Sequence, residues 1–309
     1  MEAAYMRNVK TWFFETRPQF LLLTPVCFLV GLSVAVYERS SGHSHVNGLH
    51  LVLALVGALL AHISVNVLND YFDYRSGVDL ATKRTPFSGG SGVLPAGLLK
   101  PQHVYFFGLA CLLGVAGIGI YFTVEYGVKI LPLGILGILV VYFYTTHITK
   151  TPLLCAIAPG LGFGPLMVLG TQFTQTGEYT LAAGVASLVP GFLVSNLLLL
   201  NQFPDIEADQ VASRRHFPIA LGRRSSARIY VGLMTSAYLS LIFAVALDLL
   251  PVTALIGLMT LPLAVKTGRG VLKNYDNIGG LLPFMGSNIL LTLLTPLLVG
   301  VGVLLGLLL

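Results

Sequence analysis

The chain has 309 residues, of which 55% are hydrophobic and only 10% are charged, and its formal net charge is +5. Soluble globular proteins carry about 25% charged residues, so this composition excludes a water-soluble enzyme, a disordered chain and a nucleic-acid-binding protein. We therefore expect the basic surplus to set the orientation of a membrane protein.

Nine apolar segments resemble membrane-spanning helices, which need about 20 mainly apolar residues. They are predicted at residues 19–38, 50–72, 103–122, 130–146, 152–171, 181–203, 229–247, 252–266 and 284–308. The first is predicted to be a span and not a cleavable signal, because a long polar leader precedes it and no small-residue cleavage site follows. The prediction is an all-α polytopic membrane protein with one domain over residues 1–309.

The distribution of Lys and Arg predicts the orientation in the lipid bilayer. With the N-terminus inside, only Arg39 and Lys129 of the 18 basic residues fall in outer loops. Cytoplasmic loops are enriched in Lys and Arg, so we predict a cytoplasmic N-terminus and an external C-terminus. In a prokaryote the protein would lie in the cell membrane.

Two predicted inner connections, at about 73–102 and 204–228, are much longer than the others, and such loops are often lids or binding loops. Each follows an even-numbered span that ends in a polar cluster. The pattern Asn-x-x-x-Asp occurs at 66–70 and again at 201–205. Spans 1–4 and 5–8 are therefore possible pseudo-repeats, with the ninth span added.

The first polar cluster ends the second predicted span. At about 100° per residue, Asn66, Asp70 and Asp73 fall within roughly 60° of one another on a helix. Asn69 flanks them, so one stripe presents two carboxylates and an amide. Asp79 follows the predicted helix end, and its role stays open between a ligand and a loop cap.

The second polar cluster ends the sixth predicted span. Asn201, Asp205 and Asp209 follow each other at intervals of four residues, within roughly 80° on a helix. Glu207 points elsewhere and is predicted to lie on the surface. Pro204 removes one backbone hydrogen bond, so we expect a kink just before the acids.

Both clusters place like charges where they destabilise the folded protein, and a bound cation would offset this cost. Like charges four residues apart destabilise a helix, and ionisable residues in membrane helices are expensive. Carboxylate and amide oxygens suit Mg²⁺, which typically binds one or two carboxylates plus substrate phosphates. We therefore expect the two clusters to hold Mg²⁺ and a diphosphate. The alternatives are solvated helix ends paired with arginines and, outside enzymes, a cation transporter, although transport charges usually lie near the bilayer midplane.

Other polar residues near the clusters have two interpretations each. Lys83 and Arg84, Arg214 and Arg17 are expected to bind diphosphate, and the alternative is membrane anchoring. Tyr144 ends the fourth predicted span, where it either belongs to an interfacial belt or shields a carbocation. The glycine-rich run 88–92 is predicted to be a lid rather than a phosphate-binding loop.

The two clusters resemble the signature motifs of the UbiA superfamily of intramembrane aromatic prenyltransferases. The first is Asn66-x-x-x-Asp70-x-x-Asp73 and the second is Asp205-x-x-x-Asp209. The resemblance implies nine transmembrane helices around a central cavity, with a cytoplasmic cap formed by the two long loops. It also implies Mg²⁺-dependent transfer of a polyprenyl group from polyprenyl diphosphate to a small aromatic acceptor.

Within that superfamily, residues 69–79 and 205–209 are similar to the 1,4-dihydroxy-2-naphthoate polyprenyltransferases of menaquinone biosynthesis and to the animal vitamin K prenyltransferase. This likeness implies that Mg²⁺ and diphosphate are held by Asn66, Asp70, Asp73, Asn201, Asp205 and Asp209, with Asn69, Lys83, Arg84 and Tyr144 in support. Another acceptor, such as a different quinone precursor or the glycerol-phosphate ether of archaeal lipid synthesis, is the alternative.

The chain departs from the superfamily pattern near the second motif. Many relatives have a basic residue where this chain has Pro204. A stretch like Gly-Lys-x-Thr-Leu usually follows, and here residues 214–218 read Arg-Arg-His-Phe-Pro. We expect one phosphate contact to move to Arg214 or Arg215.

Overall fold

The computed structural model describes residues 2–39, 46–82, 85 and 89–309, and in this part of the chain it is entirely helical. Eight helical segments of the described chain are long and apolar enough to cross a membrane. The fourth predicted span, 130–146, appears as a shorter apolar segment, Val128–Phe143. The all-α polytopic prediction is therefore confirmed, with one span shorter than expected.

The nine segments follow the predicted order along the chain. Their helices are α2 (Pro18–Leu21) with α3 (Leu23–Arg39), α4 (Gly48–Ser76), α6 (Pro101–Tyr126), α7 (Leu131–Phe143), α8 (Pro152–Leu161) with α9 (Met167–Thr176), α10 (Leu181–Asn201), α13 (Gly222–Ala246), α14 (Leu261–Asn274) and α15 (Ile278–Leu305). Short 3-10 turns precede α7 and α14, at Val128–Ile130 and Val252–Thr260.

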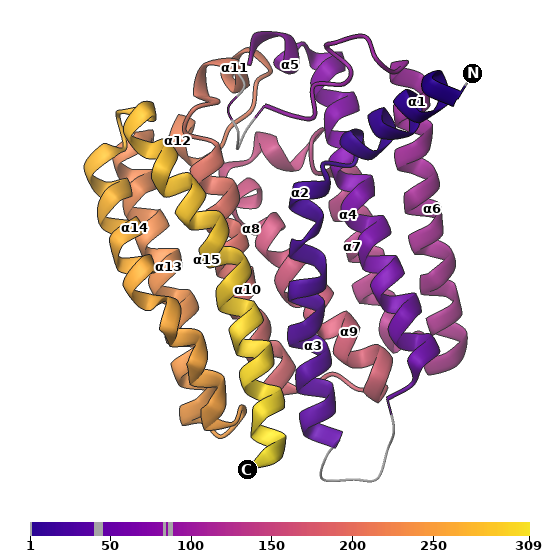
Figure 1. The fold of residues 1–309 in the computed structure, drawn as a ribbon, viewed down its shortest axis with the longest axis vertical. Coiled ribbons are helices and arrows are strands. Elements are labelled where there is room, and N and C mark those ends of the chain that lie inside the picture. The colour runs from indigo at the N-terminus through magenta and orange to yellow at the C-terminus, as the bar shows by residue number, and fades with distance from the viewer. Residues whose placement is uncertain (1, 40–45, 83–84, 86–88) are drawn as a thin grey trace.

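The helices run side by side in alternating directions, and the two chain ends lie at opposite ends of the bundle (Figure 1). The four remaining helices gather at the end that carries the N-terminus, called here the N-terminal end. They are α1 (Glu2–Glu15), α5 (Val78–Ala81), α11 (Ile206–Val211) and α12 (Phe217–Ala220).

Helix α10 forms the centre of the bundle and packs against α13, α15, α8 and α3. Small residues allow its closest approach to α8: a Cβ atom added to Gly160 would lie 2.3 Å from the carbonyl oxygen of Gly191. A π-helical turn at Gly162–Leu166 then joins α8 to α9. These glycines serve helix packing, where small side chains let backbones approach.

Several predicted boundaries are too narrow, and the differences are largest in α13 and α14. Helix α13 begins at Gly222 rather than 229, and α14 continues to Asn274 rather than 266. In α14 the reason is that Lys266, Arg269 and Lys273 all lie exposed on the helix surface. They lower the local hydropathy without ending the helix.

Candidate active site

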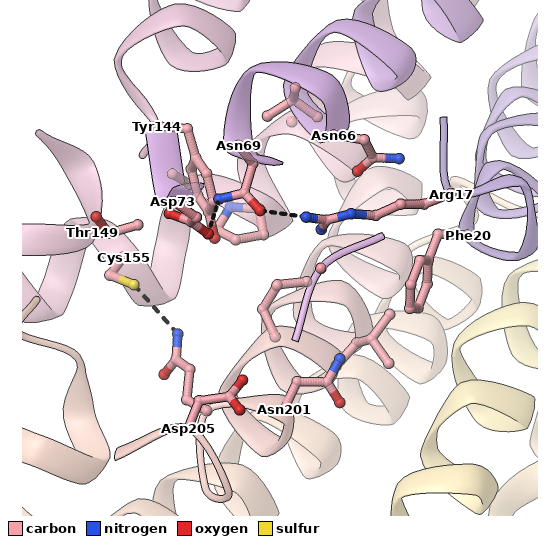
Figure 2. Close-up of a pocket in the computed structure, with 18 of the residues that line it drawn as sticks. Arg17, Phe20, Asn66, Asn69, Asp73, Tyr144, Thr149, Cys155, Asn201 and Asp205 are labelled. Carbon is pink, nitrogen blue, oxygen red and sulfur yellow. Dashed lines mark hydrogen bonds between the residues drawn. The ribbon is translucent and has the colours of Figure 1, made fainter. Parts of the chain in front are cut away.

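A cavity of about 290 Å³ lies among α2–α4, α7, α8 and α10, beneath the segments that cover the N-terminal end. It brings both polar clusters together. The predicted site residues that line it are Arg17, Asn66, Asn69, Asp73, Tyr144, Asn201, Asp205, Asp209 and Arg214. Figure 2 shows Asn66, Asn69 and Asp73 facing Asn201 and Asp205 across this space. Lys83 and Arg84 lie outside the described residues.

The first cluster lies on one face of α4, which continues unbroken to Ser76. Asn69 holds the cluster in place: its amide nitrogen donates to Oδ2 of Asp73 at 2.9 Å and to Oγ1 of Thr145 at 3.0 Å. The amide of Asn66 donates to the carbonyl oxygen of Thr16 at 3.1 Å. Neighbouring segments therefore fix the orientation of both amides.

Asp70 lies behind the cavity wall, with only 1% of its surface exposed. Its carboxylate pairs with the guanidinium of Arg17 and accepts the backbone N–H of Ser91 at 3.1 Å. Gly90 packs against it with a φ of +72°, and a Cβ atom there would lie 3.0 Å from Asp70 Oδ1. Gly90 and Ser91 of the glycine-rich run thus lie directly on the first motif.

The kink expected at Pro204 is a complete break in the helix. Helix α10 ends at Asn201, a turn follows, and the separate helix α11 begins at Ile206. Proline in a helix interior lacks the N–H and clashes with the preceding turn, so Pro204 ends the helix instead of only bending it. The turn carries Asp205 into the cavity, while Glu207 is exposed as predicted.

Arg214 connects the two clusters. Its guanidinium pairs with Asp73 of the first motif and donates to Oδ1 of Asp209, in the second, at 2.8 Å. These two carboxylates raise the pKa of Arg214 above its usual value despite burial. Arg215 is exposed outside the cavity, so only the first arginine of the pair enters the site.

His216 was not predicted, although it lines the cavity with 2% of its surface exposed. Its Nε2 lies 3.1 Å from Oδ2 of Asp209. Burial raises the pKa of Asp209, but the contacts with His216 and Arg214 outweigh it and leave that pKa below its ordinary value. Asp209 is therefore ionised at neutral pH.

Sequence reasoning also missed Cys155 and Gln202, which meet at one end of the cavity. The amide of Gln202 lies 3.3 Å from the sulfur of Cys155. A dashed line at Cys155 marks this hydrogen bond in Figure 2. Nothing in the sequence distinguished this cysteine from the other two buried ones. The contact joins α8 to the turn after α10.

The deeper part of the cavity wall is apolar. It includes Phe20, Leu23, Phe163, Met167 and Leu197. His62 lies in this region, and its Nδ1 is 2.8 Å from the hydroxyl of Thr24 on the neighbouring α3. A buried histidine needs a hydrogen-bond partner, and this interhelical contact provides one.

The donor set fits Mg²⁺ bound together with a substrate phosphate. Among the described residues, no three His, Cys, Asp or Glu side chains form a group that could hold a metal ion alone. The cavity nevertheless offers the oxygens of Asp73, Asp205 and Asp209 and the amides of Asn66 and Asn201. Mg²⁺ commonly takes one or two protein carboxylates and completes its octahedron with phosphate and water.

The fold is an all-helical bundle of membrane-spanning segments, and two Asn- and Asp-rich clusters surround one cavity. This arrangement is typical of an intramembrane enzyme. The sequence profile of the UbiA prenyltransferase family matches residues 24–289. The chain belongs to this family and is an integral, multi-pass membrane prenyltransferase.

Curated relatives match nearly the full length. The chain is 26% identical over 309 residues to the 1,4-dihydroxy-2-naphthoate octaprenyltransferase of Escherichia coli, covering 98% of each protein. It is 28% identical to the Haemophilus influenzae protein of the same name, covering 97% of each. The UbiA prenyltransferase domain-containing protein 1 of Danio rerio is 28% identical over 274 residues, which are 86% of this chain and 75% of that protein.

Solved structures share the fold. A UbiA homologue from Archaeoglobus fulgidus, bound to DMAPP and Mg²⁺, aligns with a TM-score of 0.62 at 16% identity, covering 94% of this chain and 99% of that one. A digeranylgeranylglyceryl phosphate synthase aligns with a TM-score of 0.61, also at 16% identity, covering 96% and 99%. These alignments confirm the architecture over nearly the whole chain.

Proposed function

We propose that this enzyme transfers a polyprenyl group from polyprenyl diphosphate to 1,4-dihydroxy-2-naphthoate, in a Mg²⁺-dependent step of menaquinone biosynthesis. The observation that carries the proposal is the convergence of both polar clusters on one cavity in a chain of this family. The names of the two nearly full-length bacterial relatives support the acceptor. The DMAPP and Mg²⁺ bound by the archaeal homologue support the donor and the metal.

The diphosphate would lie at the polar end of the cavity. Asp73, Asp205 and Asp209, with the amides of Asn66 and Asn201, would hold Mg²⁺, and Asp70 lies behind them. The bound metal would supply positive charge to the diphosphate oxygens. Arg17 and Arg214 line the same space. Their guanidinium groups would donate hydrogen bonds to phosphate oxygens and stabilise the leaving group.

The transfer step breaks the bond between the first prenyl carbon and the diphosphate oxygen, and the electron pair leaves with the diphosphate. A ring carbon of the electron-rich acceptor supplies the pair that forms the new C–C bond. That carbon then loses a proton or carbon dioxide, which restores the aromatic ring. The wall formed by Phe20, Phe163 and Met167 excludes water from the allylic cation, Tyr144 shields it, and the tail extends along the same apolar side.

A reconstituted reaction tests this proposal. Purified protein with octaprenyl diphosphate, 1,4-dihydroxy-2-naphthoate and Mg²⁺ should release pyrophosphate and form a C–C-linked product, detected by mass spectrometry. Loss of a preorganised charged group at the reacting centre lowers turnover about 100-fold or more, so we expect a loss of that size in Asp205→Ala. We expect a comparable loss in Asp70→Ala, because Asp70 pairs with Arg17, which lines the cavity. Glu207→Ala, at an exposed acid of α11, serves as the control. Full activity in both aspartate variants would contradict the mechanism.

An acceptor panel separates the proposed acceptor from the alternatives. Geranylgeranylglyceryl phosphate would give a C–O-linked ether, and another quinone precursor would give a product of different mass. The proposal predicts that 1,4-dihydroxy-2-naphthoate has the highest kcat/KM of the three. A preference for either other acceptor would replace the acceptor assignment and leave prenyl transfer intact.

A further inference from the structure

A buried carboxylate outside both motifs lies next to the candidate site. Glu15 is the last residue of α1, and none of its surface is exposed. Its Oε2 accepts a hydrogen bond of 2.9 Å from the hydroxyl of Ser91. Its Oε1 has no hydrogen-bond partner among the described residues. Burying a carboxylate with so few partners costs free energy. Ionisable groups perturbed by burial in this way cluster at functional sites.

Ser91 joins this carboxylate to the first motif. While its hydroxyl donates to Glu15, its backbone N–H donates to Asp70, at 3.1 Å from Oδ2 and 3.4 Å from Oδ1. The two preceding residues, Gly89 and Gly90, line the cavity. One serine therefore links Glu15, the cavity wall and a motif carboxylate.

The segment around Ser91 is flexible by composition and needs an anchor. Gly89, Gly90 and Gly92 all have positive φ angles, of 98°, 72° and 83°. Glycine loses more conformational freedom on folding than any other residue. A stretch with three glycines in four positions therefore holds its N–H on Asp70 only while a neighbouring group holds the segment in place, and the hydroxyl contact with Glu15 does this.

The N-terminal segment holds Asp70 from its other side as well. Arg17, two residues after Glu15, pairs with the Asp70 carboxylate and donates to Oδ1 of Asn69 at 2.9 Å. It does so in a left-handed backbone conformation with a φ of 55°, which costs an ordinary residue free energy and persists only when its surroundings impose it. Residues 15–17 thus support the first motif both directly and through Ser91.

We propose that Glu15 is a positioning residue: through Ser91 it holds segment 89–92 on the cavity and the Ser91 N–H on Asp70, and so sets the affinity for prenyl diphosphate. The inference rests on the proposed function, because it takes the diphosphate to bind beside this motif. Glu15 is not among the described residues that line the cavity. Its effect should therefore appear in the binding of one substrate and not in the chemistry.

Steady-state kinetics provide the first test. Without its anchor the segment loses the hydrogen bond that holds Ser91, so Glu15→Ala should raise the KM for prenyl diphosphate about tenfold. The value of kcat and the KM for the acceptor should stay within about twofold. Glu15→Gln keeps an oxygen that accepts from Ser91 and should retain the wild-type KM. Glu207→Ala, which removes an exposed glutamate, is the matched control.

Hydrogen exchange provides a second test that needs no substrate. In the wild-type enzyme the Ser91 amide is protected by Asp70, and in Glu15→Ala it should exchange about ten times faster. Ser91→Ala leaves Glu15 in place, removes the hydroxyl and should give the same acceleration, which keeps the test valid if Glu15→Ala does not fold. In the double variant the KM should rise no further than in either single variant, because both break one contact.

The two tests separate this inference from the proposed function. A wild-type protein without prenyl transfer would contradict the proposed function, and hydrogen exchange would still decide whether Glu15 anchors the segment. Unchanged exchange at Ser91 in Glu15→Ala would overturn the inference. An active enzyme in which Glu15→Ala raises the KM of both substrates equally would also overturn it.

Discussion

Arg214 neutralises carboxylates from both acidic clusters, and this bridging depends on the shape of its side chain. A guanidinium carries several N–H groups in a planar fork, whereas lysine offers a single ammonium. We expect Arg214→Lys to raise the KM for prenyl diphosphate about tenfold and Arg214→Gln to raise it more, because charge-assisted hydrogen bonds are lost. The exposed Arg215 provides the control. Equal effects of Arg214→Gln and Arg215→Gln in kinetic assays would exclude this role.

The raised pKa of Glu15 predicts how the stability of the fold depends on pH. Burial raises the pKa of Glu15 from 4.5 to about 7, although the Ser91 hydrogen bond and the Arg17 charge lower it. The folded state therefore favours the protonated form. The contribution of Glu15 to the free energy of unfolding is fully present below about pH 4.5 and is lost as the pH rises through about 7. The loss is at most about 3 kcal/mol.

Glu15→Gln removes that titration and should show the difference directly. At pH 8 the variant should unfold at a higher temperature than the wild-type protein, because it buries no charge. At pH 5 the two should unfold within a few degrees of each other. Thermal unfolding in detergent, followed at several pH values, measures this. A constant difference across pH would show that Glu15 does not titrate in this range.

At the scale of elements, the sequence predicted what depends on local composition and missed what depends on tertiary contacts. Hydropathy identified the order of the spans, and α4 carries its polar stripe on a regular helix as expected. Pro204 was expected to bend the helix and instead lies in a turn after its end. The positions of Asp205 and Asp209 are therefore determined by this turn and by helix α11. His216 and Glu15 were missed since neither belongs to a periodic pattern. Only the fold reveals that they are buried.

The contact between α8 and α10 gives a prediction about helix packing. A Cβ atom at Gly160 would overlap the Gly191 carbonyl and the Ser195 hydroxyl, each 2.3 Å away. Overpacking of this kind costs about 1–3 kcal/mol, so Gly160→Ala should lower the unfolding temperature. Gly134→Ala is the matched control, because nothing lies within 4 Å of the added methyl group. There the loss of glycine flexibility should leave stability unchanged or raise it by about 0.5–1 kcal/mol.

At the scale of the whole molecule, the N-terminus and the helices α1, α5, α11 and α12 share one end of the bundle (Figure 1). The two acidic clusters lie at the same end, at the ends of α4 and α10. By the distribution of Lys and Arg, we propose that this end faces the cytoplasm. A charged diphosphate made in the cytoplasm would then reach the cavity without crossing the bilayer. The isoprenoid tail would remain in apolar surroundings.

Cysteine labelling tests this orientation. The native cysteines, Cys27, Cys111 and Cys155, are all buried, so their background labelling should be low. Arg215→Cys places an exposed thiol at the N-terminal end, and Lys129→Cys places one at the opposite end. In intact cells a membrane-impermeant maleimide should label the cysteine at 129 and spare the one at 215. Inside-out vesicles should reverse the pattern. Labelling at 215 in intact cells would place the site on the outer face and contradict the charge argument.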